Sequence, residues 1–203
     1  MTRILIFGYY LTAHSIQRVL QSGGYECLVP QRGNLNPQGH EQGLEYEKQA
    51  LEILRTRTID LFIHDLNRFG TRGYLWGGVE FLQKRKCDKF LSEIPVLTVS
   101  AAAPQLIVEL LQGVGLDVES DLGDFLSVPL CPIELLDVVE SILRRHGKSI
   151  PPQAETARAK LYEKQRDRES RMLAGPPSKQ THHKKRRRRH PPDVAANPIP
   201  PTK

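Results

Sequence analysis

The sequence has few cysteines and no long apolar run. Cys27, Cys87 and Cys131 are its only cysteines, and they share no CxxC spacing. This pattern excludes a disulfide framework and indicates a reducing compartment, and we interpret all three thiols as buried and inert. The apolar run at residues 3–7 is too short for a signal peptide or a membrane helix. We therefore expect a cytoplasmic protein with no membrane span.

Hydrophobic residues make up only 39% of the 203 residues, and the charges are unevenly distributed. Residues 1–148 contain 15 Lys and Arg against 18 Asp and Glu, a net charge of −3. Residues 149–203 contain 14 against 5, a net charge of +9. This asymmetry predicts a basic C-terminal arm that binds an anionic partner, such as nucleic acid, an acidic protein or an anionic membrane surface.

Up to about residue 146, short apolar runs alternate with segments of helical spacing. The runs predicted to be strands are residues 3–7, 25–29, 60–66, 95–100 and 124–128. The segments predicted to be helices are residues 11–22, 44–57, about 79–91, about 104–113 and 132–146. Five β-α units in succession predict an α/β fold with a doubly wound, five-stranded parallel sheet. In such sheets the functional residues lie beyond the carboxyl ends of the strands.

The residues at those strand ends resemble the receiver domains of response regulators. The segment DLFIHDLNRFGTRG, residues 60–73, resembles the receiver strand that ends in the phospho-acceptor aspartate, here Asp65. Further receiver positions match along the chain: Ser100 at the hydroxyl position, Phe125 at the aromatic switch position and Pro129 after the fifth strand. The resemblance covers about residues 1–146. It implies the flavodoxin-like receiver fold, a place in two-component phosphorelay signalling, and a partner such as a sensor histidine kinase.

Three positions depart from the receiver pattern where its chemistry resides. Receivers carry two acidic residues after the first strand, which bind Mg²⁺ together with the acceptor, and Gly8 and Tyr9 stand there in this chain. The lysine that contacts the phosphoryl group is replaced by Val128. Phosphoryl transfer depends on positioning and on stabilisation of negative charge, and Mg²⁺ needs several oxygen ligands. We therefore predict a degenerate receiver, not an enzyme and without a cofactor, in which phosphorylation of Asp65 is weak or lost.

Several residues near this site have alternative roles. Asp65 caps the loop after its strand through backbone N–H groups, is a vestigial phospho-acceptor, or binds something else. We interpret the Ser100 hydroxyl as a local hydrogen-bonding group and His64 as a core residue. Tyr9 and the tyrosine after it are expected to fill the former acidic pocket with their rings. Trp76, in a segment additional to the usual receiver loop, either anchors a partner or folds back over the pocket.

The C-terminal part, residues 148–203, is predicted to be a charged, Pro-rich and largely disordered tail behind a domain at residues 1–147. Residues 154–173 are compatible with a solvated helix but are too polar to pack a core. The candidate polyanion-binding residues are six consecutive cations: Lys184, Lys185, Arg186, Arg187, Arg188 and Arg189. No base-reading motif accompanies them, so a tail that only aids solubility is the alternative.

Three functions remain open at this stage. The leading hypothesis is a non-enzymatic signalling module that acts by protein contact, near Phe125 and the last two strands. The second is a working response regulator that is phosphorylated at Asp65. The third is a nucleic-acid-associated protein that uses its basic tail.

Overall fold

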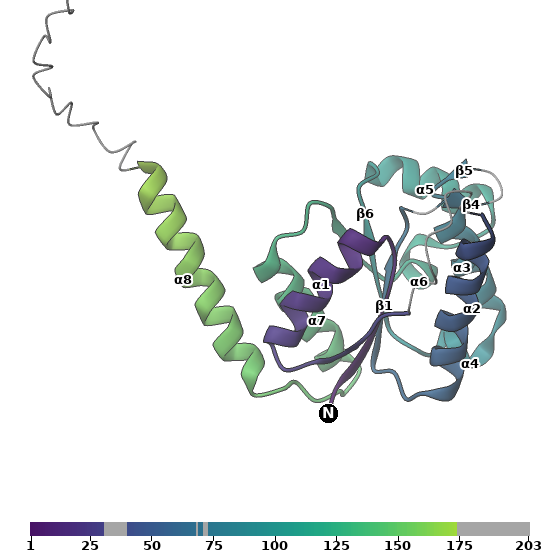
Figure 1. The fold of residues 1–203 in the computed structure, drawn as a ribbon. Coiled ribbons are helices and arrows are strands. Elements are labelled where there is room, and N and C mark those ends of the chain that lie inside the picture. The colour runs from purple at the N-terminus through teal and green to yellow at the C-terminus, as the bar shows by residue number, and fades with distance from the viewer. Residues whose placement is uncertain (31–39, 68, 71–72, 174–203) are drawn as a thin grey trace, which may run out of the picture.

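The computed structural model describes residues 1–30, 40–67, 69–70 and 73–173, and its centre is a five-stranded parallel sheet (Figure 1). The strands of this sheet are β1 (Arg3–Phe7), β2 (Glu26–Leu28), β3 (Leu61–Asp65), β6 (Val96–Ser100) and β7 (Asp124–Ser127). Their spatial order is β2-β1-β3-β6-β7. The strand order reverses beside β1, so the predicted doubly wound, five-stranded parallel sheet is confirmed.

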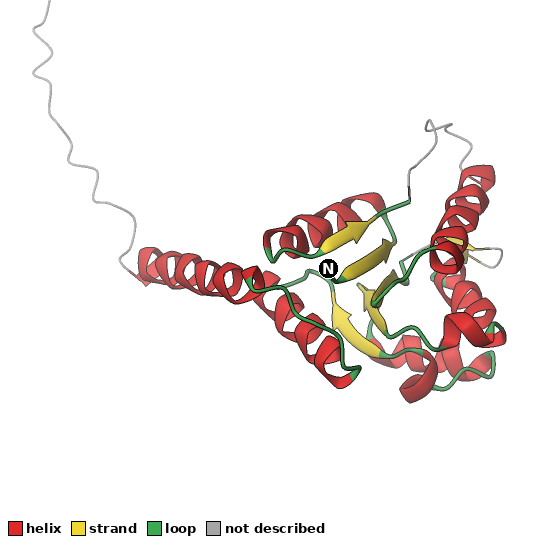
Figure 2. Ribbon diagram, turned by 90° about the horizontal axis from the view of Figure 1, so that it is seen from below, coloured by secondary structure: helices red, strands yellow, loops and turns green. Residues whose placement is uncertain are grey.

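Helices cover both faces of the sheet (Figure 2). They are α1 (Tyr10–Ser22), α2 (His40–Thr56), α3 (Trp76–Cys87), α4 (Lys89–Ser92), α5 (Pro104–Gly113), α6 (Val118–Asp121), α7 (Pro132–Arg145) and α8 (Gln153–Leu173). Both α5 and α7 begin with proline, which lacks the N–H that a first helical residue would leave unpaired. Within the described ranges, no helix is long and apolar enough to cross a membrane.

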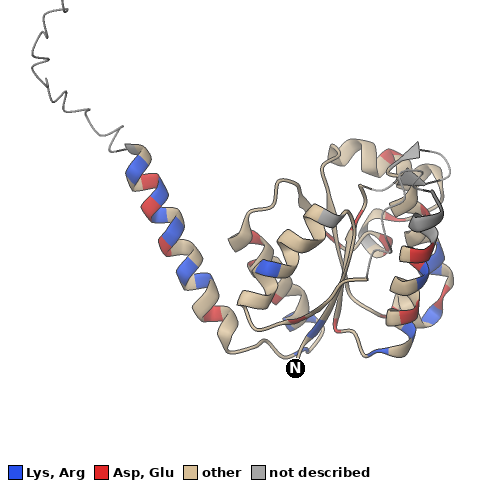
Figure 3. Ribbon diagram, viewed as in Figure 1, with Lys and Arg blue, Asp and Glu red and all other residues tan. Residues whose placement is uncertain are grey.

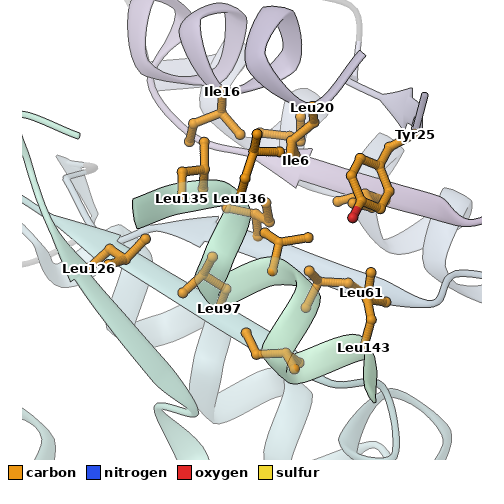
Figure 4. Close-up of a cluster of buried hydrophobic side chains, with 14 of the residues drawn as sticks. Ile6, Ile16, Leu20, Tyr25, Leu61, Leu97, Leu126, Leu135, Leu136 and Leu143 are labelled. Atoms are coloured by element: carbon orange, nitrogen blue, oxygen red, sulfur yellow. The ribbon is translucent and has the colours of Figure 1, made fainter. Parts of the chain in front are cut away.

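One face of the sheet packs against α1 and α7 (Figure 4). Alternate residues of each strand point to this face, as the two-residue period of a strand requires. Leu5, Ile63, Leu97 and Leu126, one from each of four strands, are all buried, with Leu5 on the opposite face from the other three. This apolar layer explains why the central strands read as continuous hydrophobic runs.

The other face packs against α2, α3 and α5 and is rich in aromatic rings. Phe7, Phe62 and Phe81 surround the buried ring of His64, with ring centroids 5.9, 5.6 and 5.2 Å from it. His64 lies one residue before Asp65 and points to the opposite side of β3. It is a core residue of this aromatic cluster, as the sequence indicated.

The segment before α3 contains structure that periodicity did not predict. Two short strands, β4 (Phe69–Gly70) and β5 (Gly73–Tyr74), pair in antiparallel orientation as a separate two-stranded sheet. Leu75 follows it in the left-handed conformation, with φ of 71°, and its side chain is buried. Trp76, the first residue of α3, is half-buried against apolar residues of α3 and α5, and its role as a partner anchor stays a prediction.

The prediction that all three cysteines are buried is wrong for two of them. Cys87, at the last position of α3, and Cys131, just before α7, are exposed because both lie at helix ends. Cys27 in β2 is partly buried, and burial raises the pKa of its thiol to about 12. Only Cys27 therefore fits the expectation of an inert thiol.

Residues 148–161 belong to the folded domain, which corrects the view that this stretch cannot pack a core. Ala154 and Ala157 are buried against the apolar layer of α1 and α7, and Leu161 packs at its edge. Arg158 reaches Glu140 at 3.0 Å and Asp137 at 3.1 Å, and the Glu140 side chain is 2% exposed. Small side chains at these positions let a polar helix approach α7 closely, which a scan for large apolar residues misses.

A chain ending at Gly147 tests this correction. We predict that it folds but is about 2–4 kcal/mol less stable than a chain ending at Leu173, because it loses the apolar contacts of α8 and a partner of the buried Glu140. Urea unfolding of the two chains measures the difference. Equal midpoints would show that α8 adds nothing to the domain, and a molten product would mean that residues 1–147 are not an independent unit.

Candidate functional site

Parallel pairing brings the predicted site residues to one edge of the sheet. Phe7 of β1 lies opposite His64 of β3, so the residues that follow them, Gly8 and Asp65, are neighbours at the strand ends. Asp65 in turn lies opposite Val99 of β6, the residue before Ser100. The strand order thus assembles positions that are far apart in the sequence.

The carboxylate of Asp65 is buried, with 2% of the residue exposed. Its Oδ2 accepts a hydrogen bond from the backbone N–H of Tyr9 at 3.1 Å. Its Oδ1 accepts two hydrogen bonds from Asn67, at 2.8 Å from the backbone N–H and at 2.7 Å from Nδ2. The carboxylate therefore ties the loop after β3 to the loop after β1, which is the loop-capping arrangement considered from the sequence.

Asn67 links the carboxylate to the end of β6, and sequence reasoning did not single it out. Its side-chain Oδ1 accepts hydrogen bonds from the backbone N–H of Ala101 at 3.1 Å and from Ser100 Oγ at 3.2 Å. Ser100 Oγ in turn accepts one from the N–H of Ala102 at 3.1 Å. Its position, two residues after an aspartate at a strand end, was the feature of the sequence that could have indicated this role. One amide thus lies between the acceptor position and the hydroxyl position of the receiver motif.

Gly8 allows an unusually close approach between β1 and β3. A Cβ atom on Gly8 would lie 2.3 Å from Cβ of Asp65, a distance that non-bonded carbon atoms do not reach. The carbonyl of Gly8 also accepts a hydrogen bond from the hydroxyl of Tyr46, a buried residue of α2. In this arrangement position 8 has no room for the acidic side chain that receivers carry there.

Tyr9 contributes its backbone to the site. The residue is 52% exposed, so its ring does not fill a closed pocket as the sequence suggested. The side chain of the next tyrosine lies outside the described part of the structure. Tyr9 reaches the carboxylate of Asp65 through its backbone N–H.

The end of β7 completes the site without a cation. Val128 is half-buried against the α1–α7 layer, and its backbone N–H donates to the carbonyl of Ser100 at 2.8 Å. The peptide bond between Val128 and Pro129 is cis. Phe125 lies opposite Thr98 and packs beside the residues of α3 and α5. Val128 therefore supports the backbone at this edge and supplies no charge.

The donor set at this edge does not fit Mg²⁺. Asp65 is the only carboxylate among the three receiver positions that would bind the ion, since the other two are Gly8 and Tyr9. Among the described residues, Asp65 forms no ion pair, and no group of three His, Cys, Asp or Glu side chains is placed to hold a metal. Both oxygens of Asp65 already accept hydrogen bonds. A hard dication needs several oxygen ligands, which these residues do not provide.

Three of the loops beside the site contain no charged residue, and we call them the rim: residues 9–11, 101–106 and 129–132. Residues 98–108 and 125–133 contain no Asp, Glu, Lys or Arg. Three large side chains of the rim are exposed: Tyr9, Leu11 (64%) and Leu106 (45%). Apolar surface of this kind, without charges to desolvate, is characteristic of the centre of a protein interface.

The six candidate cations of the tail, Lys184 to Arg189, lie outside the described residues. The basic residues within the described range that belong to the same arm are those of α8. Figure 3 shows blue and red segments alternating along this helix.

Comparison with solved structures identifies the fold. A two-component response regulator from Clostridium difficile superposes with a TM-score of 0.50 at 18% identity, over 72% of this chain and 98% of that chain. A sensor protein from Polaromonas sp. JS666 gives a TM-score of 0.51 at 18% identity, over 71% and 97% of the two chains. No protein-family model and no curated protein sequence matches the chain. The likeness confirms that the chain adopts the receiver fold.

Substituting Gly8 tests the close approach of β1 and β3. We predict that Gly8→Ala lowers the free energy of unfolding by about 1–3 kcal/mol, because the added methyl group forces the two strand ends apart. Gly113→Ala is the matched control, since a Cβ at the end of α5 meets no atom within 4 Å. Thermal and urea unfolding measure both. A Gly8→Ala protein as stable as the Gly113→Ala protein would mean that the strands separate without cost.

Proposed function

We propose that this chain is a degenerate receiver, a signalling module that acts by protein contact and does not use Asp65 as an efficient phospho-acceptor. It is neither an enzyme nor a cofactor-binding protein on this proposal. The observation that carries it is the hydrogen bonding of Asp65, whose two oxygens are both held by the loops of the domain.

The hydrogen bonds around Asp65 oppose phosphorylation in two ways. A phosphoryl group on Oδ1 of Asp65 would have to displace the Asn67 side chain, which also bonds to Ser100 and Ala101, and one on Oδ2 would compete with the N–H of Tyr9. It would then bring several negative charges into a site where Val128 supplies no compensating cation and Gly8 no metal ligand. Phosphoryl transfer is catalysed almost entirely by positioning and electrostatic stabilisation, and both are reduced here.

Protein contact is supported by the rim. A receiver that responds to phosphate carries its charges at this edge, whereas the rim of this chain is uncharged and partly apolar. Exposed Tyr and Leu side chains on a rigid scaffold can anchor a partner at low entropic cost. The partner on this proposal is a signalling protein, such as a sensor histidine kinase, that contacts the ends of α1 and α5.

Acetyl phosphate tests the chemical part of the proposal. We predict that the full chain, incubated with acetyl phosphate and Mg²⁺, gains no stoichiometric phosphoryl group in intact-mass spectrometry. The double variant Tyr9→Asp, Val128→Lys supplies an acid and a cation without a side chain at Gly8. Any labelling it gains reports what the missing charges contribute.

Stoichiometric labelling of the unmodified chain, abolished by Asp65→Asn, would contradict the proposal. It would establish a working response regulator that is phosphorylated without the usual metal site. A receiver domain with a complete acidic site, treated in parallel, verifies the reagent.

Affinity capture tests the contact surface. The variant Leu11→Asp, Leu106→Asp places charges on the rim. We predict that the amount of partner protein it captures is lower by a factor of about ten or more than the amount captured by the unmodified chain. Phe90→Asp is the matched control, because Phe90 is also exposed but lies in α4 at the opposite end of the sheet. Loss of the partner with Phe90→Asp, or its retention on the rim variant, would place the contact elsewhere.

A further inference from the structure

Helix α8 carries a stripe of cations along the part that leaves the domain. Its first turns pack on the α1–α7 layer through Ala154, Ala157 and Leu161. Beyond Leu161 every described residue of the helix is exposed, and Figures 1 and 2 both show this part pointing away from the domain. The distal half of α8 is therefore a solvated arm on a fixed base.

Four basic residues follow one line on this arm: Lys160, Lys164, Arg168 and Arg171. Their spacings of four, four and three residues place them within an arc of about 80° of the helix surface. Successive members lie about 6 Å apart along the axis, and the four together span about 16 Å. The acidic residues of α8, namely Glu155, Glu163, Asp167 and Glu169, all fall outside this arc.

These four cations, which we call the α8 stripe, are not used by the fold. All four are exposed. Among the described residues, the ion pairs of α8 are those of Arg158 with Asp137 and Glu140, and none involves the stripe. The two roles of the helix are therefore separate, with Arg158 holding the base and the stripe facing solvent.

Arg158 gives the stripe a defined direction. Its guanidinium bonds to Glu140 and Asp137 of α7, and the chain before α8 is held as well, because Lys148 pairs with Asp60 at 3.2 Å. Residues 1–148 have a net charge of −3, so a polyanion is attracted to the arm rather than to the domain. The geometry favours contact along the arm.

We propose that the α8 stripe binds the phosphate backbone of a nucleic acid duplex, independently of its sequence. Duplex DNA presents phosphates about 3.4 Å apart per strand, so the stripe spans about five nucleotides. Lysine and arginine both bind phosphate, and arginine does so with two parallel hydrogen bonds. On this proposal the lysines and arginines of the stripe contact phosphates, which carry no sequence information, so affinity does not depend on sequence.

The composition of the arm disfavours two other anionic partners. A helix that lies on a membrane needs an apolar face beside its basic one. Between residues 162 and 172 the arm has only Tyr162 and Met172 as large apolar side chains. An acidic protein would need a complementary interface with a buried apolar centre, which four cations in line do not offer. A duplex needs only regularly spaced charge.

Fluorescence anisotropy with a labelled 20-base-pair duplex tests the proposal on the full chain. The stripe variant is Lys160→Gln, Lys164→Gln, Arg168→Gln, Arg171→Gln, and glutamine preserves helix propensity. The matched control removes four exposed cations that form no ion pair among the described residues: Arg18→Gln, Arg57→Gln, Lys89→Gln and Arg166→Gln. A third variant replaces Lys184 to Arg189 with glutamine and isolates the contribution of the stripe. Circular dichroism verifies that α8 stays helical.

The expected result concerns the slope of log affinity against log salt. Each phosphate contact contributes about −0.9 to this slope. The slope of the stripe variant should therefore be less negative than that of the unmodified chain by about 3.6, while the control keeps the slope of the unmodified chain. The Lys184–Arg189 variant should retain a slope of about −3.6, equivalent to about a 100-fold loss of affinity between 50 and 200 mM salt. Two duplexes of unrelated sequence should bind equally.

Four results would overturn the proposal. They are equal slopes for the stripe variant and its control, complete loss of binding in the Lys184–Arg189 variant, strong preference for one duplex sequence, and no binding at 50 mM salt. If the chain does not bind the duplex, binding to polyglutamate would indicate that the partner is an acidic protein. Binding to vesicles with 30% phosphatidylserine would indicate a membrane surface.

Discussion

The contact between Gly8 and Asp65 is the constraint on which the candidate site depends. Because position 8 has no side chain, the end of β1 lies against the Asp65 side chain, and the N–H of Tyr9 reaches its carboxylate. Asn67 holds the other oxygen and joins it to the end of β6. The aspartate that receivers phosphorylate is therefore used here to hold together the loops at the carboxyl ends of the strands.

The molecule separates its charges from its apolar surface. The rim at the carboxyl edge is uncharged, whereas α8 presents a line of four exposed cations that form no ion pair among the described residues. On the two proposals, the rim and the α8 stripe are docking surfaces of different chemistry on separate parts of the chain. The receiver fold supports this arrangement because its loops vary while the sheet and its two helical layers stay fixed.

Sequence periodicity predicted the sheet well, because the continuous apolar runs of its three central strands are typical of parallel strands buried on both faces. It also predicted the residues that meet at the strand ends, since parallel pairing brings those ends together. It missed Asn67, whose role depends on side-chain direction, and the docking of α8, where Ala154 and Ala157 pack by being small. It misjudged Tyr9 and two cysteines, because exposure at loops and helix ends is a tertiary property.

The most direct test of the central claim is a ¹H–¹⁵N NMR titration with beryllofluoride and Mg²⁺, since beryllofluoride mimics a phosphoryl group bound to a carboxylate. The amides of Tyr9, Asn67 and Ala101 take part in the hydrogen bonds around Asp65. The account predicts that their resonances stay where they are in the untreated protein. Saturable displacement of all three together, absent in Asp65→Asn, would show that the site still accepts a phosphoryl group.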